Sequence, residues 1–286
     1  MDNNINSYFM QPIKIDTIGE IYPIKLKDYE HFKLISSKYL MCGQKWLSNI
    51  LKRPKDDCPL DFFVNMGYSV SELENKIKDI PDEVSDNNIK EIKEQIKLLK
   101  TNGLEFNIKD IIEMFEMTLH KPVEFKPIGK IKGNFEYIFD IVGTDYFINR
   151  DNFNAYRNIV MEQNLIYEPL TSPQKQGNEI ISKAIESLNK NGIEVSISSI
   201  LSSVKMFSGI NDDELKEYTY YRLMMDFETV NRINNNLINA IFRSVGNEQC
   251  EISALAEKID MDKNPYKGLL KKHNSNNSFD KNFQQG

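Results

Sequence analysis

The chain has 286 residues, of which 40% are hydrophobic and 27% charged, a composition that supports a packed core and excludes a disordered polymer. Its formal net charge of -6 at pH 7 argues against broad contact with a nucleic-acid backbone, which requires a basic face. No window approaches the ~20 apolar residues of a membrane span, and the first ten residues lack the pattern of a signal peptide. We therefore expect no membrane association and a location in the cytoplasm of the cell that makes the protein.

The first 41 residues predict a β-hairpin followed by a helix. Residues 12–16 and 20–26 alternate apolar and polar side chains on either side of a turn, which is typical of two paired strands. Asp28 then fits the N-cap of a helix that runs to about Met41, with its large apolar residues on one face.

The next segment has helical spacing in several pieces. We expect short helices at residues 44–51 and 60–66, and a third piece that begins at the capping box of residues 69–72. Apolar residues recur at helical intervals in residues 87–100 and again in residues 107–119. The N-terminal half is therefore mostly helical up to residue 119.

A second β region is expected in the middle of the chain. Short strands separated by Gly and Asn turns are predicted at residues 122–128, 129–133, 135–142 and 146–148. A helix at residues 153–163 follows, and two prolines between residues 168 and 176 mark a linker.

The sequence after the linker predicts helices and no strands. The predicted helices cover residues 177–190, 196–206, 212–217, 219–245 and 252–259. The fold class is therefore mainly α (α+β), with an N-terminal β-hairpin, a small central β element and a C-terminal helical bundle. We predict an N-terminal α+β region at 1–168, a C-terminal helical region at 174–272 and a mobile tail at 273–286.

The helix predicted at residues 219–245 has the longest apolar repeat in the chain. Leu223, Phe227, Val230, Leu237 and Ile241 follow one stripe, and Asn234 occupies the position where the next apolar residue would fall. A polar residue there can select the register or oligomeric state of a coiled coil. Because the run is shorter than four heptads, the pattern favours an ordinary core helix, and self-association remains the alternative.

Residues suited to catalysis or metal binding are sparse. The three cysteines, Cys42, Cys58 and Cys250, and the three histidines show no ligand spacing, and the chain has neither GxxxxGK[ST] nor GxGxxG. We predict no metal, no cofactor and no enzymatic activity. A Cys–His pair assembled only in three dimensions is the catalytic alternative.

A helix-turn-helix at residues 196–221 is the one nucleic-acid alternative. The second helix of such a motif should carry basic or amide side chains toward the bases. Here it begins with Asp212, Asp213 and Glu214, whose charges would repel the duplex. The sequence therefore argues against DNA binding. A pair of packed helices explains the same order of helix, turn and helix.

Large adaptable side chains gather where the chain enters its longest helix. They are Tyr218, Tyr220, Tyr221, Met224 and Met225. Tyr and Met suit protein contacts, and these five span more of the helix surface than one buried face covers. We predict that a partner protein binds here, with core packing at a helix junction as the alternative. The edge of the N-terminal hairpin is a second candidate, by β-addition.

Four stretches resemble proteins encoded among the tail genes of bacteriophages of Gram-positive bacteria. Residues 12–40 read PIKIDTIGEIYPIKLKDYEHFKLISSKYL, and residues 144–169 read TDYFINRDNFNAYRNIVMEQNLIYEP. Residues 208–223 read SGINDDELKEYTYYRL, and residues 259–271 read IDMDKNPYKGLLK. The hairpin-then-helix opening is similar to that of tail assembly chaperones of phages and prophages.

The resemblance implies a role in virion morphogenesis inside the host bacterium. Tail assembly chaperones hold the tape-measure protein soluble while tube subunits polymerise around it. The expected partners are therefore tail proteins, either the tape measure or the tube. The first alternative is a structural component of the tail or baseplate. The second and less favoured alternative is a regulatory DNA-binding protein.

Overall fold

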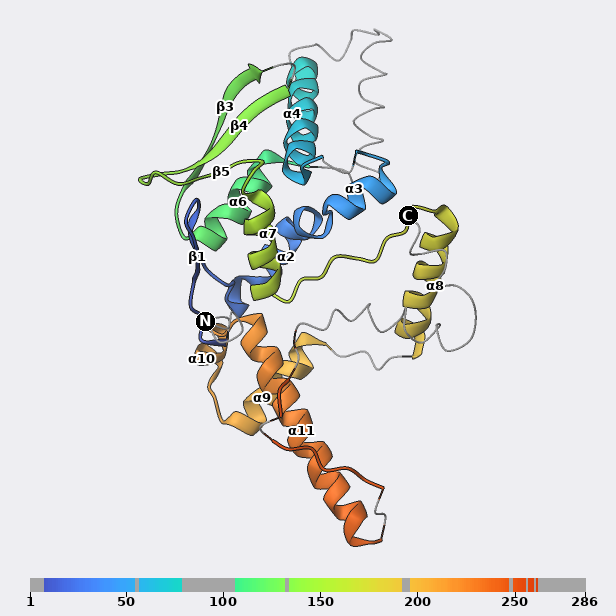
Figure 1. The fold of residues 1–286 in the computed structure, drawn as a ribbon. Helices are drawn as coiled ribbons and strands as arrows, with labels where there is room; N and C mark the ends of the chain where they lie inside the picture. Colours follow the sequence, from blue (N-terminus) through green and yellow to red (C-terminus); the bar gives the residue numbers. More distant parts are fainter. Residues whose placement is uncertain are drawn as a thin grey trace. The chain divides into compact units, whose positions relative to one another are not determined.

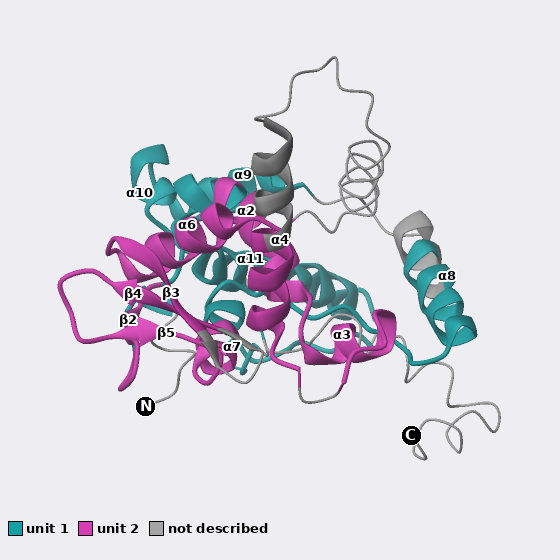
Figure 2. Cartoon of the chain, turned by 90° about the horizontal axis from the view of Figure 1, so that it is seen from above, with its two compact units in different colours: residues 1–13, 23–30, 160–286 teal, residues 14–22, 31–159 magenta. Residues whose placement is uncertain are grey.

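The computed structural model describes residues 8–54, 57–78, 106–131, 134–191, 196–246, 249–255, 257–259 and 261. As predicted, the fold is mainly α, with an N-terminal hairpin and a small central sheet (Figure 1). The chain forms two compact units, coloured separately in Figure 2. Unit 1 comprises residues 1–13, 23–30 and 160–286, and unit 2 comprises residues 14–22 and 31–159. Unit 1 thus draws on both predicted regions, and the predicted tail at 273–286 lies outside the described residues.

The helices of unit 2 come from the first 159 residues. They are most of α2 (Leu26–Met41), α3 (Gln44–Ile50), α4 (Pro59–Lys78), α6 (Ile108–Leu119) and the first part of α7 (Phe153–Gln163). Their order follows the prediction, although the helix expected at residues 87–100 lies outside the described residues.

The short pieces predicted at residues 60–66 and from residue 69 are wrong as separate helices, because α4 runs through both. Gly67 lies inside this helix at a point of close approach, where an added Cβ would come within 3.1 Å of the Phe106 carbonyl oxygen. This glycine, which lies between the two predicted pieces, is therefore explained by close packing inside one helix.

The β elements are two antiparallel sheets. β1 (Ile13–Ile15) pairs with β2 (Gly19–Ile21), and a second sheet has the order β3-β4-β5. The bounds of its strands are Val123–Ile131, Asn134–Ile141 and Phe147–Ile148. The strands predicted at 122–128 and 129–133 are one strand, β3, whose register against β4 shifts between Pro127 and Gly129. A β-bulge at this point keeps the strand continuous across the proline.

Aromatic side chains fill the core of unit 2. Phe115 on α6 makes edge-on contacts with Phe139 of β4, at 5.0 Å between ring centroids, and with Tyr156 of α7, also at 5.0 Å. The Tyr156 hydroxyl shares a 2.6 Å hydrogen bond with the Thr118 hydroxyl, and burial raises its pKa. Helix α6 therefore joins the sheet to α7 through one apolar cluster with its polar atoms paired.

The helices of unit 1 are α8 (Lys175–Asn191), α9 (Ile197–Ser208), α10 (Asp212–Lys216) and α11 (Tyr220–Ser244). Side-chain caps fix the starts of the last three: Ser196, Asn211 and Thr219 each accept a hydrogen bond from a backbone N–H of the following turn. Gly209, at φ 70°, ends α9 in the left-handed conformation that glycine adopts without strain.

The core of unit 1 lies between α9, α10 and α11. Its buried members are Ile200, Val204, Leu215, Tyr218 and Leu223. The start of α2 packs against this core through Leu26, whose N–H donates to the Tyr218 carbonyl at 2.7 Å. Both Lys25 and Lys27 form ion pairs with Glu217, at 2.6 and 2.7 Å.

The Glu217 ion pairs predict a pH dependence of stability. Hydrogen bonds from Lys25 and then Lys27 lower the pKa of Glu217 from 4.5 to about 2. Since the folded-state pKa is depressed, the stabilisation is complete above pH 4.5 and is lost as pH falls toward 2. Urea unfolding of wild type and Glu217→Gln should therefore differ at pH 6 and converge between pH 4.5 and 2. A difference that persists unchanged at the acidic end would contradict the assignment.

One predicted helix, at residues 252–259, is wrong. Residues 251–254 have no helical or strand assignment, and the Glu251 carbonyl and both main-chain groups of Ser253 bind side chains of α11. Local apolar spacing predicted a helix, but the tertiary hydrogen bonds prevail over that propensity.

Candidate functional site

Of the five residues predicted to bind a partner, four lie on several sides of α11 and Tyr218 precedes the helix. Tyr218 and Tyr221 are buried, at 6% and 2% exposure. Tyr220 is half-buried and stacks on Tyr29 at 4.5 Å between ring centroids. Met224 packs against the core of unit 1, and Met225 is half-buried. The structure therefore does not bring all five to one open face, and partner binding through them stays a prediction.

An aromatic–cation cluster explains the buried end of this group. The Arg222 guanidinium lies 3.8 Å from the ring centroid of Tyr218 and 5.4 Å from that of Tyr8. The Tyr8 hydroxyl donates to Asp226 at 3.3 Å, and burial raises the pKa of Asp226. These contacts fasten residue 8 to the first turns of α11, so this end of the helix is part of the architecture of unit 1.

The apolar stripe of α11 is covered over only part of its length. Leu223 and Val230 are buried, and Leu223 belongs to the cluster that includes α9 residues Ile200 and Val204. Helix α9 has 12 residues and α11 has 25, which correspond to about 18 Å and about 37 Å of helix. Helix α9 is thus too short to cover the whole stripe.

The second half of the stripe is exposed. We call it the distal face; its members are 49–76% exposed, and they are Leu237, Ile238, Ile241, Phe242 and Val245. Their spacing of one, three and four residues places them on one broad side of the helix. The one charged residue among them in the sequence, Arg243, falls on the other side of the helix at about 100° per residue. Sequence reasoning found this stripe and interpreted it as core, because periodicity alone does not tell where a covering helix ends.

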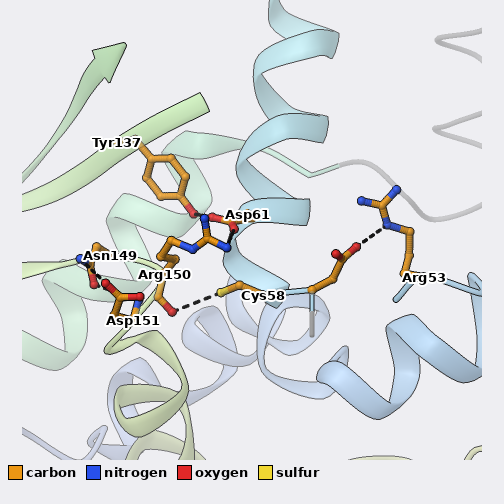
Figure 3. Close-up of polar contacts among 8 residues, drawn as sticks. Arg53, Cys58, Asp61, Tyr137, Asn149, Arg150 and Asp151 are labelled. Atoms are coloured by element: carbon orange, nitrogen blue, oxygen red, sulfur yellow. Dashed lines mark hydrogen bonds and ion pairs between the residues drawn. The ribbon is translucent and has the colours of Figure 1, made fainter. Parts of the chain in front are cut away.

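A polar cluster in unit 2 is the other group of side chains with possible chemistry (Figure 3). The Cys58 thiol donates to the Arg150 carbonyl at 3.4 Å, Arg150 pairs with Asp61 at 3.3 Å, and the Tyr137 hydroxyl donates to Asp61 at 2.7 Å. Burial raises the pKa of the Cys58 thiol and of the Tyr137 phenol. Both groups stay protonated at neutral pH. They therefore suit a hydrogen-bonded contact between α4 and β4 rather than nucleophilic chemistry.

Removing the Tyr137 hydroxyl should destabilise unit 2. Tyr137→Phe leaves Asp61 without this donor, and a hydrogen bond to a charged group contributes roughly 1.5–3 kcal/mol. Urea unfolding followed by fluorescence of Trp46, the single tryptophan, reports on this unit. The control is Tyr22→Phe, which removes a solvent-exposed hydrogen bond to Glu20. Equal effects of the two changes would contradict a structural role for the cluster.

The remaining candidates give no constellation for catalysis in the described part of the chain. His31 pairs with Glu113 at 2.6 Å, His120 stacks on Tyr22, and His273 lies outside the described residues. Within the described ranges, no three His, Cys, Asp or Glu side chains gather as metal ligands would, and no helix has the length and apolar composition to cross a bilayer.

The helix-turn-helix alternative has a one-turn second helix. Helix α10 has five residues, and two of its three acidic residues, Asp212 and Asp213, pair with Lys205 and Lys216. It presents too little surface, of the wrong charge, to enter a major groove.

One family model matches the part of the chain that contains the distal face. Residues 188–260, about a quarter of the chain, match the family model described as the YomV second domain. Comparison with the curated proteins and with the solved structures finds no significant match. The match extends from the end of α8 to the segment after α11, and it associates the chain with proteins encoded in phage regions.

Proposed function

We propose that this protein is a non-enzymatic phage tail morphogenesis factor, an assembly chaperone that binds a helical tail protein during assembly. The tape measure and the tube protein are the proposed clients. The observation that carries the proposal is the distal face of α11, an exposed apolar surface inside the segment that matches a phage-associated family.

The physical properties of the distal face favour a helical client. A helix buries an apolar stripe by packing it against another helix, and the first half of α11 already does so with α9. The second half continues this stripe with exposed apolar side chains. An amphipathic helix with its own apolar face would complete the packing. A tape-measure protein, which is long and helical, presents many such faces before the tube encloses it.

The size of the distal face suits reversible binding. Five large side chains on about two turns of helix form a small patch, whereas permanent interfaces bury ~2,000 Å² or more. A chaperone must release its client, so a modest contact is an advantage. A structural tail component would instead keep this contact in the finished particle.

Mass spectrometry of purified virions separates these two roles. An assembly chaperone should be abundant in infected or induced cells and absent from mature particles. The major tube protein in the same sample is the internal standard for copy number. Recovery of this chain in particles at a fixed ratio to the tube protein would overturn the chaperone proposal in favour of a structural component.

A further inference from the structure

The side of α11 opposite the distal face binds the chain segment that follows the helix. We call the described residues 251–255 and 257 the strap; it runs back along α11 (Figure 1). Asn236 contacts Ser253 twice: its amide nitrogen donates to the Ser253 carbonyl at 2.7 Å, and its amide oxygen accepts from the Ser253 N–H at 3.0 Å. Asn239 donates to the Glu251 carbonyl at 2.7 Å.

Arg232 continues these contacts toward the other end of the strap. Its guanidinium donates to the Leu255 carbonyl at 3.2 Å and also to the Glu257 carbonyl. A longer contact, at 3.5 Å, reaches the Ala254 carbonyl. One row of α11 side chains, four and three residues apart, thus binds main-chain groups of residues 251, 253, 254, 255 and 257.

The first part of the strap is bound at alternate residues. Asn239 contacts Glu251 and Asn236 contacts Ser253, and in an extended chain the N–H and C=O of every second residue point to the same edge. A turn follows, because the Glu257 N–H donates to the Ala254 carbonyl at 3.1 Å, and Arg232 binds carbonyl groups of this turn. Asn236 and Asn239 therefore act on residues 251–253 as a neighbouring strand would, with side-chain amides in place of backbone groups.

The strap contributes little through its own side chains. Ile252 and Leu255 are 47% and 64% exposed, and every hydrogen bond from α11 given above ends on a backbone atom of the strap. A polar hollow of about 600 Å³ remains beside the strap, lined by residues that include Glu228, Asn231 and Asn235. Recognition of this kind depends on extended main chain and tolerates many side chains.

We propose that Asn236 and Asn239 form a binding strip for extended polypeptide, recognised through its main chain, which the strap occupies until another protein segment displaces it. The ligand class is an unfolded or extended protein segment without proline at the position bound by Asn236. The strip lies on the polar side of α11, so the proposal goes beyond the helical docking on the distal face and does not require it.

The strap competes with any such ligand from within the same chain. Few residues separate it from the end of α11, so its effective concentration at the strip is in the millimolar range. A free peptide should therefore bind poorly to the wild-type chain. It should bind well once the strap has lost its main contact.

The test weakens the strap in the full-length chain and adds the strap as a separate peptide. Ser253→Pro removes the N–H that Asn236 accepts, whereas the control Ser253→Ala keeps it. The probe is a fluorescently labelled peptide with the sequence of residues 249–259, and binding is measured by anisotropy. We expect Ser253→Pro to bind the peptide at least about tenfold more tightly than Ser253→Ala, a difference of about 1.4 kcal/mol. Equal binding by the two variants, or none by either, would overturn the proposal.

Two further arms test the mode of recognition. In the Ser253→Pro chain, Asn236→Leu should weaken peptide binding at least about tenfold, and a scrambled peptide should bind as well as the original. A peptide N-methylated at the position of Ser253 should bind about tenfold more weakly, and this arm requires no second protein variant. A scrambled peptide that fails to bind, or an N-methylated peptide that binds unchanged, would identify the strap as a sequence-specific structural segment. Neither result would bear on the chaperone role, which the virion measurement tests separately.

Discussion

Phe115→Ala is expected to lower the free energy of unfolding of unit 2 by about 3–5 kcal/mol, the range for removing a buried phenylalanine. Phe115 is fully buried and contacts Phe139, Phe153 and Tyr156. The cavity would lie where α6, α7 and the central sheet meet, so no single element can move to fill it. Urea unfolding followed by Trp46 fluorescence measures the loss, because Trp46 lies in α3 of the same unit.

The matched control for this change is Phe147→Ala. Phe147 lies on β5 and is 38% exposed, so its removal should cost about 1 kcal/mol or less. A loss for Phe115→Ala as small as that for Phe147→Ala would show that the aromatic cluster is not the core of unit 2.

Leu223→Ala should lower the stability of unit 1 strongly and Leu237→Ala should hardly change it. Both substitutions make the same change on the same stripe of α11. Leu223 is fully buried against α9, and its truncation should cost about 2–5 kcal/mol. Leu237 is 59% exposed, so its truncation should change stability by about 0.5 kcal/mol or less, because alanine also favours helix. Hydrogen exchange of the α9 and α11 amides reports both values in unit 1.

This pair tests whether the distal face is free in the isolated protein. A large loss for Leu237→Ala would mean that another surface, such as a second copy of the chain, covers the distal face. The same experiment at several protein concentrations identifies that case, because protection by a second copy rises with concentration.

The sequence predicted the fold well where local signals and tertiary packing agree. The hairpin near residue 20, the central strands and α11 follow from alternation, turns and apolar periodicity. The N-caps Ser196 and Asn211 lie at the starts of the helices predicted at residues 196–206 and 212–217. In each case the residue type that makes the local contact also marks that position in the sequence.

The parts of the candidate site that the sequence did not predict depend on long-range contacts. Tyr218 and Tyr221 were candidates for a partner surface, yet residues near the other end of the chain help to bury this end of α11, as the Tyr8 contacts show. The exposure of the distal face follows from the length of α9, which periodicity in α11 cannot reveal. The strap contains apolar residues at helical spacing, and only the side chains of Asn236 and Asn239 make its extended form favourable. Five asparagines between residues 231 and 239 were the signal that could have indicated a polar binding face.

The central claim is that the distal face of α11 captures a helical tail protein, and a co-purification experiment tests it most directly. The full-length chain would be expressed together with the products of neighbouring tail genes, and the tape-measure and tube proteins that it retains would be quantified. Ile241→Asp places a charge at the centre of the distal face, whereas Thr229→Asp places the same charge on an exposed position elsewhere on the helix.

We predict that wild type and Thr229→Asp retain the tape-measure or tube protein to the same extent. Ile241→Asp should retain at least about tenfold less, because it removes about 1.5–3 kcal/mol of apolar burial and adds the cost of burying a charge. Circular dichroism would establish that all three proteins are equally helical. Equal capture by Ile241→Asp and Thr229→Asp, or no capture of either tail protein by wild type, would contradict the claim.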